Sequence, residues 1–92
     1  MTYKIRLTKT AEQHLTQWRK TGQTKMLLKI VSLFEELRQH PRFGTGQVEQ
    51  LKGNLSGYWS RRIDKYHRMI YMIEDDTITV EVVSLRGHYD DK

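Results

Sequence analysis

The 92-residue sequence contains no cysteine, which excludes a disulfide framework and any metal site with thiolate ligands. This absence agrees with a protein of the reducing cytosol. The sequence also lacks an apolar run near the roughly 20 residues needed to cross a bilayer, and its first residues lack the apolar core of a signal peptide. We therefore expect a cytoplasmic protein that has no membrane partner.

Acidic residues are scarce in the first two thirds of the chain. Residues 1–37 carry seven basic and three acidic side chains, residues 38–68 carry seven and two, and residues 69–92 carry two and six. The net charge is +5. A cationic surface attracts polyanions, which favours nucleic acid as a partner, although many basic domains bind an acidic protein instead. Both kinds of partner stay open at this point.

Proline occurs once, at Pro41, and it separates a helical part from a strand-rich part. Residues 3–7 alternate between apolar and basic side chains, which predicts a short strand with one face inward. Two helical patterns follow. The first begins at Thr8 or Thr10, and the second begins after a cap at Thr24 and stops at the proline.

Three strand-like runs follow a loop rich in glycine: residues 58–63, 67–74 and 77–85. The apolar positions of the last run change parity near Val82, which predicts a β-bulge there. A chain of this length has one modest core, so residues 1–92 form a single domain in this interpretation. The predicted fold is α+β, with two N-terminal helices packed on one face of a small antiparallel sheet.

The strand-rich part places one carboxylate, Glu49, among several cations, and His88 and Tyr89 follow the last strand. The cations are Lys52, Arg61, Arg62, Lys65 and Arg68. Cleavage of RNA without a metal requires a group that deprotonates the 2′-hydroxyl, a group that stabilises the phosphorane, and an acid for the 5′-oxygen. Carboxylate, guanidinium and imidazole can fill these three roles, so the set is suited to phosphodiester cleavage.

Each of these residues also has a simpler interpretation. A glutamate in a loop, such as Glu49, is more often a solvated surface carboxylate. Arg61 and Arg62 are adjacent in a strand and point to opposite faces, so at most one of them faces a given site. Arg68 begins the central strand, where a charge is costly unless it is paired or contacts a ligand. No pair of histidines has the spacing of a zinc site, and we expect no metal or other cofactor.

The run LKGNLSGYWSRRI, together with HRMIY and the terminal RGHY, resembles the YoeB/Txe branch of the RelE-like toxins over nearly the whole chain. The resemblance implies the microbial RNase fold of that family and the toxin role in a type II toxin-antitoxin system. It implies a ribosome-dependent, metal-independent endoribonuclease that cuts mRNA in the ribosomal A site by 2′-hydroxyl attack. It also implies an acidic antitoxin as partner and pairing of two toxin subunits.

The same motifs imply roles for individual residues. Glu49 resembles the general base of the family, and Arg68 resembles the residue that stabilises the transition state. His88 resembles the general acid, and Tyr89 the aromatic residue that orients the substrate. The predicted RNA contacts are Lys52, Arg61, Arg62 and Lys65. The chain departs from the family pattern at its end, where Asp90, Asp91 and Lys92 follow the final tyrosine.

Two other classes of function remain open from the residues alone. One is a non-catalytic basic module that binds nucleic acid or an acidic protein. It predicts that growth inhibition survives the substitutions Glu49→Gln and His88→Ala but not charge reversal at the arginines. The other is a purely structural subunit of a complex, for which expression would leave translation unaffected.

Overall fold

The computed structural model describes residues 2–87. Strand β1 (Lys4–Leu7) is followed by helices α1 (Lys9–Lys20) and α2 (Thr24–Gln39). The later strands are β2 (Glu49–Gln50), β3 (Trp59–Arg62), β4 (Arg68–Glu74) and β5 (Thr79–Ser84), with short 3₁₀ turns at Gly53–Leu55 and Asp75–Thr77. The two helices and the four predicted strands are confirmed, and the short strand β2 lies where the sequence indicated a loop.

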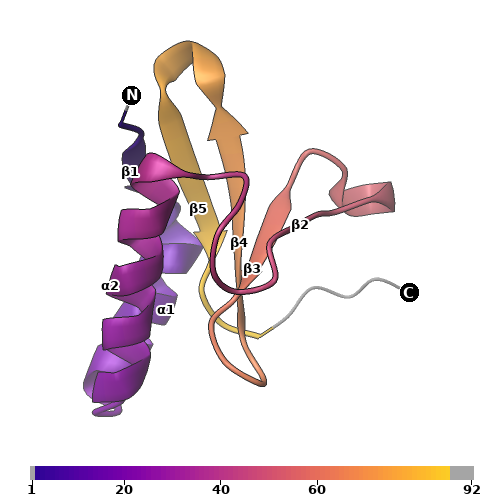
Figure 1. The fold of residues 1–92 in the computed structure, drawn as a ribbon. Coiled ribbons are helices and arrows are strands. Elements are labelled where there is room, and N and C mark those ends of the chain that lie inside the picture. Colours follow the sequence, from indigo (N-terminus) through magenta and orange to yellow (C-terminus); the bar gives the residue numbers. More distant parts are fainter. Residues whose placement is uncertain (1, 88–92) are drawn as a thin grey trace.

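The five strands form one sheet in the order β1-β5-β4-β3-β2 (Figure 1). Strands β2 to β5 are antiparallel to their neighbours, as predicted, but β1 pairs with β5 in parallel, with Ile5 opposite Val80. The sheet is therefore mixed, which corrects the prediction of a wholly antiparallel sheet. No hairpin constrains the direction of β1, because both helices and three strands separate it from β5 in the chain.

The first helix is capped by Thr8, one of the two predicted threonines. Its hydroxyl oxygen accepts a hydrogen bond from the Ala11 amide at 3.1 Å and donates to the Val83 carbonyl at 2.9 Å. The cap therefore also ties the start of α1 to β5. The predicted cap at Thr24 is wrong, because this residue lies inside α2 and Gln23 precedes the helix without a side-chain cap.

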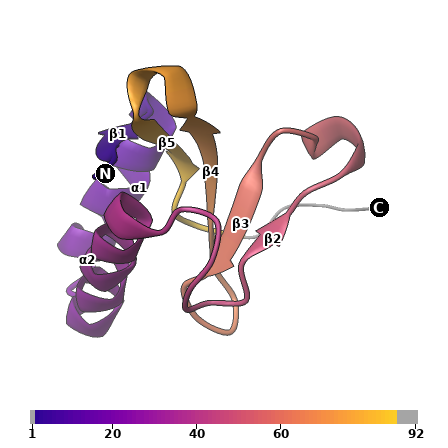
Figure 2. The ribbon, with the colours of Figure 1, turned by 45° about the horizontal axis from the view of Figure 1, so that its top comes forward.

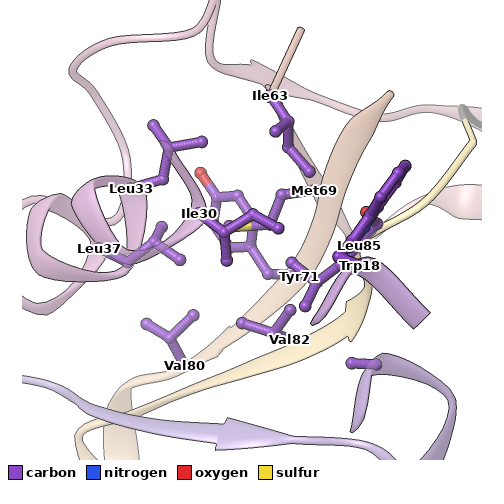
Figure 3. Close-up of a cluster of buried hydrophobic side chains, with 11 residues drawn as sticks. Trp18, Ile30, Leu33, Leu37, Ile63, Met69, Tyr71, Val80, Val82 and Leu85 are labelled. Carbon is purple, nitrogen blue, oxygen red and sulfur yellow. The ribbon is translucent and has the colours of Figure 1, made fainter. Parts of the chain in front are cut away.

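The core lies between the helices and one face of the sheet (Figure 3). Its largest members come from all layers: Trp18, Ile30, Leu33, Leu37, Ile63, Met69, Tyr71, Val80, Val82 and Leu85. Burial of one such apolar side chain stabilises the fold by about 1.5–3 kcal/mol, so this face is committed to packing. A functional site has to lie on the other face or at the end of the sheet that the helices leave open.

The helices lie toward one edge of the sheet. In Figures 1 and 2, α1 and α2 lie side by side near β1 and β5, whereas β3 and β2 extend away from the helices.

The predicted bulge near Val82 is confirmed, since Tyr71 pairs with Val82 but Ile70 pairs with Ser84, which leaves Val83 as the extra residue. After the bulge, Leu85 is buried in the core.

Candidate active site

Three neighbouring strands bring polar side chains together on the face opposite the core. Arg68, the first residue of β4, pairs with Arg62 of β3, and Glu49 of β2 pairs with Ser60 of β3. Side chains alternate along a strand, so Ser60, Arg62 and Arg68 share one face while the buried Met69 points to the other. The sheet register thus places the predicted base Glu49 close to two of the predicted arginines.

Arg68 is half-buried and oriented by contacts from two sides. Its Nε donates to the Ser60 hydroxyl oxygen, and its Nη2 donates to the Gln47 carbonyl at 2.9 Å. Burial lowers the pKa of Arg68 below its usual value, the negative charge of Glu49 acts in the opposite direction, and the positive charge of Arg62 lowers the pKa further. An arginine stays protonated at neutral pH, so the site presents a fixed positive charge beside a carboxylate.

The chain that leads to Glu49 lies directly over β3. The Gly46 carbonyl accepts a hydrogen bond from the Arg62 amide, and a Cβ at Gly46 would lie only 2.7 Å from the Arg62 carbonyl oxygen. Gln47 has a left-handed backbone with φ of 51°, a conformation that costs a non-glycine residue about 1–2 kcal/mol. The Gln47 carbonyl accepts a hydrogen bond from Arg68, so the unusual backbone contributes to the site.

The described chain ends beside Arg68. The Gly87 carbonyl accepts a hydrogen bond from the Arg68 amide at 2.7 Å, and the Gly87 amide donates to His67 Nδ1 at 2.8 Å. His88 and Tyr89, the predicted general acid and substrate-orienting aromatic, lie outside the described residues. The last described residue is thus hydrogen-bonded to the backbone of one predicted catalytic residue and directly precedes two others in the sequence.

A second imidazole supports the same segment. His14 Nδ1 accepts a hydrogen bond from the Leu85 amide at 3.1 Å, and the Trp18 indole nitrogen donates to the Leu85 carbonyl at 3.0 Å. Burial and, to a smaller extent, the charge of Arg86 lower the pKa of His14 from 6.5, which favours the neutral ring that can accept this bond. No local sequence pattern predicts the contact between His14 and Leu85, because the two residues are 71 positions apart.

Arg61 has a role different from the one the sequence suggested. Its side chain is fully buried, its Nη1 pairs with Glu36 Oε1 at 3.0 Å, and its Nη2 donates to the carbonyls of His40 and Phe43, each at 3.0 Å. It is on the opposite face from the exposed Arg62, as the alternation predicted. Because it has no exposed atom for a ligand, we assign Arg61 a structural role in place of the predicted RNA contact.

The two predicted lysine contacts lie apart along β3. Lys52 is exposed just before the 3₁₀ turn that leads into β3, and Lys65 is exposed in the turn after it. Lys65 Nζ lies 5.9 Å from the ring centroid of the exposed Tyr66. The lysines therefore flank the Glu49, Arg62 and Arg68 group at opposite ends of the strand and do not join it.

The arrangement supplies two of the three functions that cleavage of a phosphodiester requires: one carboxylate that can accept a proton and two guanidinium groups that can stabilise negative charge, on a common face. Within residues 2–87, no group of three or more histidine, aspartate and glutamate side chains is placed to hold a metal ion. The helices in the same range are too short or too polar to cross a membrane.

Comparisons with known proteins identify the family. The family model described as the YoeB-like toxin of bacterial type II toxin-antitoxin systems matches residues 7–89. The toxin YoeB of Synechocystis sp. is 42% identical over 72 residues, which cover 78% of this chain and 81% of the relative.

Two solved structures share the fold. The YoeB/ParE toxin from Agrobacterium tumefaciens superimposes with a TM-score of 0.88 at 35% identity, over 94% of this chain and 99% of the other. YoeB in the heterotetrameric YoeB-YefM complex of Staphylococcus aureus gives a TM-score of 0.81 at 31% identity, over 97% and 100%. The protein therefore belongs to the YoeB-like toxins of bacterial type II toxin-antitoxin systems.

Proposed function

We propose that this toxin is a ribosome-dependent mRNA endoribonuclease that inhibits translation in the cytoplasm. The observation that supports the proposal is the grouping of Glu49, Arg62 and Arg68 on the open face of the sheet, with Gly87 hydrogen-bonded to the Arg68 backbone. His88 and Tyr89 follow Gly87 directly in the sequence. A base, two cations, an acid and an aromatic side chain are then available to one RNA strand.

The proposed reaction begins when Glu49 takes the proton of a ribose 2′-hydroxyl. The 2′-oxygen forms a bond to phosphorus, the bond from phosphorus to the 5′-oxygen breaks, and His88 gives a proton to the departing oxygen. The products are a 2′,3′-cyclic phosphate and a 5′-hydroxyl, without a metal ion. Arg68 and Arg62 stabilise the charge that develops on the phosphate oxygens, and Tyr89 orients a base by stacking. Lys52 and Lys65 contact the RNA backbone on either side.

The partners are proposed from the relatives. YoeB of Staphylococcus aureus has been solved with YefM as a heterotetramer and also as a dimer. We propose that this chain also binds a cognate antitoxin and forms a toxin homodimer. An acidic antitoxin fits the net charge of +5. The other proposed partners are the mRNA and the ribosome, whose rRNA presents a dense array of phosphates.

The decisive test maps 5′ ends on a defined mRNA in a purified translation system. The wild type should cut at A-site codons only when ribosomes are present, and Glu49→Gln and His88→Ala should each lower the cleavage rate by about 10²- to 10⁴-fold, the usual worth of a proton-transfer group. Glu35→Gln, at an exposed carboxylate on α2, is the matched control and should cut normally.

Two outcomes would contradict the proposal. A wild type that binds ribosomes or stops translation without cutting would support the basic binding module instead. Cleavage that disappears with EDTA and returns with magnesium, while the ribosomes are kept intact, would contradict the metal-independent mechanism.

A further inference from the structure

The segment between α2 and β2, residues 40–48, leads the chain to Glu49 and is fastened to a buried ion pair. We call this segment the α2–β2 loop. Arg61 of β3 and Glu36 of α2 form the pair beneath it, with 3.0 Å between Nη1 and Oε1. Arg61 is fully buried, while the side chain of Glu36 keeps 30% of its exposure. Neither group belongs to the proposed proton-transfer chemistry, so the pair has another use.

The pair binds the loop at three backbone points. Arg61 Nη2 donates to the carbonyls of His40 and Phe43, and Glu36 Oε1 accepts the Thr45 amide at 2.8 Å. Arg61 thus uses Nη1 for Glu36 and Nη2 for the loop, whereas Glu36 accepts from both Arg61 and Thr45 through Oε1. Each of these bonds joins a charged side chain to the backbone, and charge-assisted bonds of this kind are stronger than neutral ones.

The loop also packs closely on the pair. A Cβ at Gly44 would lie 2.5 Å from Glu36 Oε1 and 3.1 Å from Arg61 Nη1, and a Cβ at Gly46 would lie 2.7 Å from Arg61 Cγ. Both glycines have positive φ, at 129° and 98°. Gly44 and Gly46 are therefore required for close contact between the loop and the ion pair.

From this anchor the loop reaches the candidate active site within a few residues. The Gly46 carbonyl accepts the Arg62 amide, the Gln47 carbonyl accepts Arg68 Nη2, and Glu49 follows two residues later on β2. A displacement of the loop would move the proposed base and the partner of the proposed transition-state residue together.

We propose that Glu36 and Arg61 are positioning residues of this toxin, which hold the α2–β2 loop so that Glu49 and Arg68 keep their mutual geometry. The inference rests on the proposed function, and it adds two residues that do not touch the substrate. Arginine is needed at position 61 because its planar guanidinium donates at once to the Glu36 carboxylate and to two backbone carbonyls. A lysine ammonium on a flexible side chain does not reproduce this geometry.

The test uses Arg61→Lys, which retains the charge, and Glu36→Gln, which retains the shape. Cleavage of ribosome-bound mRNA is measured as a rate at saturating toxin and as the toxin concentration that gives half of that rate. We expect the saturated rate to fall by about tenfold or more, because small displacements of catalytic groups are costly, while the half-saturating concentration stays within about twofold.

A control separates positioning from simple loss of stability. Val80→Ala creates a cavity in the core at β5 and lowers stability without removing a hydrogen bond of the ion pair. Rates are compared per folded molecule. If Arg61→Lys and Glu36→Gln cut as fast as Val80→Ala on this basis, the positioning role is contradicted.

A second readout does not depend on activity. In Arg61→Lys the amides of Thr45 and Arg62 should exchange with solvent faster than in the wild type. The amides of Lys4 and Thr8, which donate to the carbonyls of Ile78 and Val82, should exchange at the wild-type rate. Unchanged exchange at Thr45 and Arg62 would overturn the inference. A wild type that does not cut would instead contradict the proposed function, and the exchange comparison would still decide whether the pair holds the loop.

Discussion

Burial divides two adjacent arginines of β3 into different kinds of residue. Arg61 has no exposure and needs partners, because a buried guanidinium without them would lose its hydration uncompensated. Glu36 and two loop carbonyls provide these partners, although the Nε atom of Arg61 is buried without one. Arg62 is exposed and keeps its charge available to a ligand. One step along a strand therefore separates a structural charge from a candidate binding charge.

The pH dependence of stability tests the Glu36 carboxylate. Burial raises the pKa of Glu36, but hydrogen bonds from Thr45 and the charges of Arg61 and Lys29 outweigh it, so that pKa lies below 4.5. The unfolded chain then binds more protons than the folded one in this range. We expect the stabilisation to be fully present above about pH 4.5 and to be lost as the pH falls through the lowered pKa.

In Glu36→Gln the free energy of unfolding should therefore depend less on pH at the acidic end, as measured by urea unfolding from pH 3 to 7. Its stability at neutral pH should fall by about 2 kcal/mol, because hydrogen bonds to a charged group are lost. Glu35→Gln, on the same helix, is the control. A pH dependence as steep in Glu36→Gln as in the wild type would show that the carboxylate contributes nothing there.

At the scale of elements, the segment after β5 is held by one imidazole ring from α1 and one from the residue that directly precedes β4. His14 accepts the Leu85 amide and His67 accepts the Gly87 amide, each through Nδ1. An imidazole accepts at Nδ1 only when that nitrogen carries no proton. The bulge at Val83 precedes these contacts and sets the direction in which the chain leaves the sheet.

Substitution of His67 tests this support. In His67→Asn the amide oxygen can take the place of Nδ1, so the Gly87 amide should keep its protection from hydrogen exchange. In His67→Ala the acceptor is lost, and we expect faster exchange at Gly87 and a loss of about 1 kcal/mol relative to His67→Asn. Exchange by NMR and urea unfolding measure the two effects. Equal protection in both variants would mean that the imidazole nitrogen does not hold the segment.

At the scale of the whole molecule, charge and architecture act in the same direction. The helices lie near β1 and β5, whereas β3 and β2 extend away from them (Figure 2). Arg62 is on β3 and pairs with Arg68 on the neighbouring strand β4. Two acidic residues of the last third, Glu74 and Glu81, form ion pairs with Arg6 of the edge strand β1. A polyanion should therefore approach the end of the sheet that carries the site.

Salt dependence distinguishes the two edges. Arg62→Gln should reduce the slope of the logarithm of ribosome affinity against the logarithm of salt concentration by about 1, because one phosphate contact is lost. Arg6→Gln removes another exposed arginine, at the opposite edge of the sheet, and should leave the slope unchanged. Filter binding at several salt concentrations measures both. An equal effect of the two substitutions would indicate a diffuse field instead of a contact at Arg62.

Local periodicity and one long motif were sufficient for much of this protein. Alternation and helical spacing depend on neighbouring residues, so both helices, four strands and the bulge near Val82 could be predicted from the sequence. The run LKGNLSGYWSRRI, with HRMIY and RGHY after it, indicated the family, because it fixes many residue types at fixed spacing. The α+β class followed from the order of the elements.

Only the tertiary structure decided features that depend on residues distant in the chain. The parallel pairing of β1 with β5, the burial of Arg61 against Glu36, and the two imidazole acceptors join positions about 20 to 75 residues apart. No local pattern encodes such contacts, because burial is a property of the assembled layers. The sequence therefore determined which helices and strands form and to which family the chain belongs. Packing determined which charged side chains remain at the surface, where they can contact a ligand.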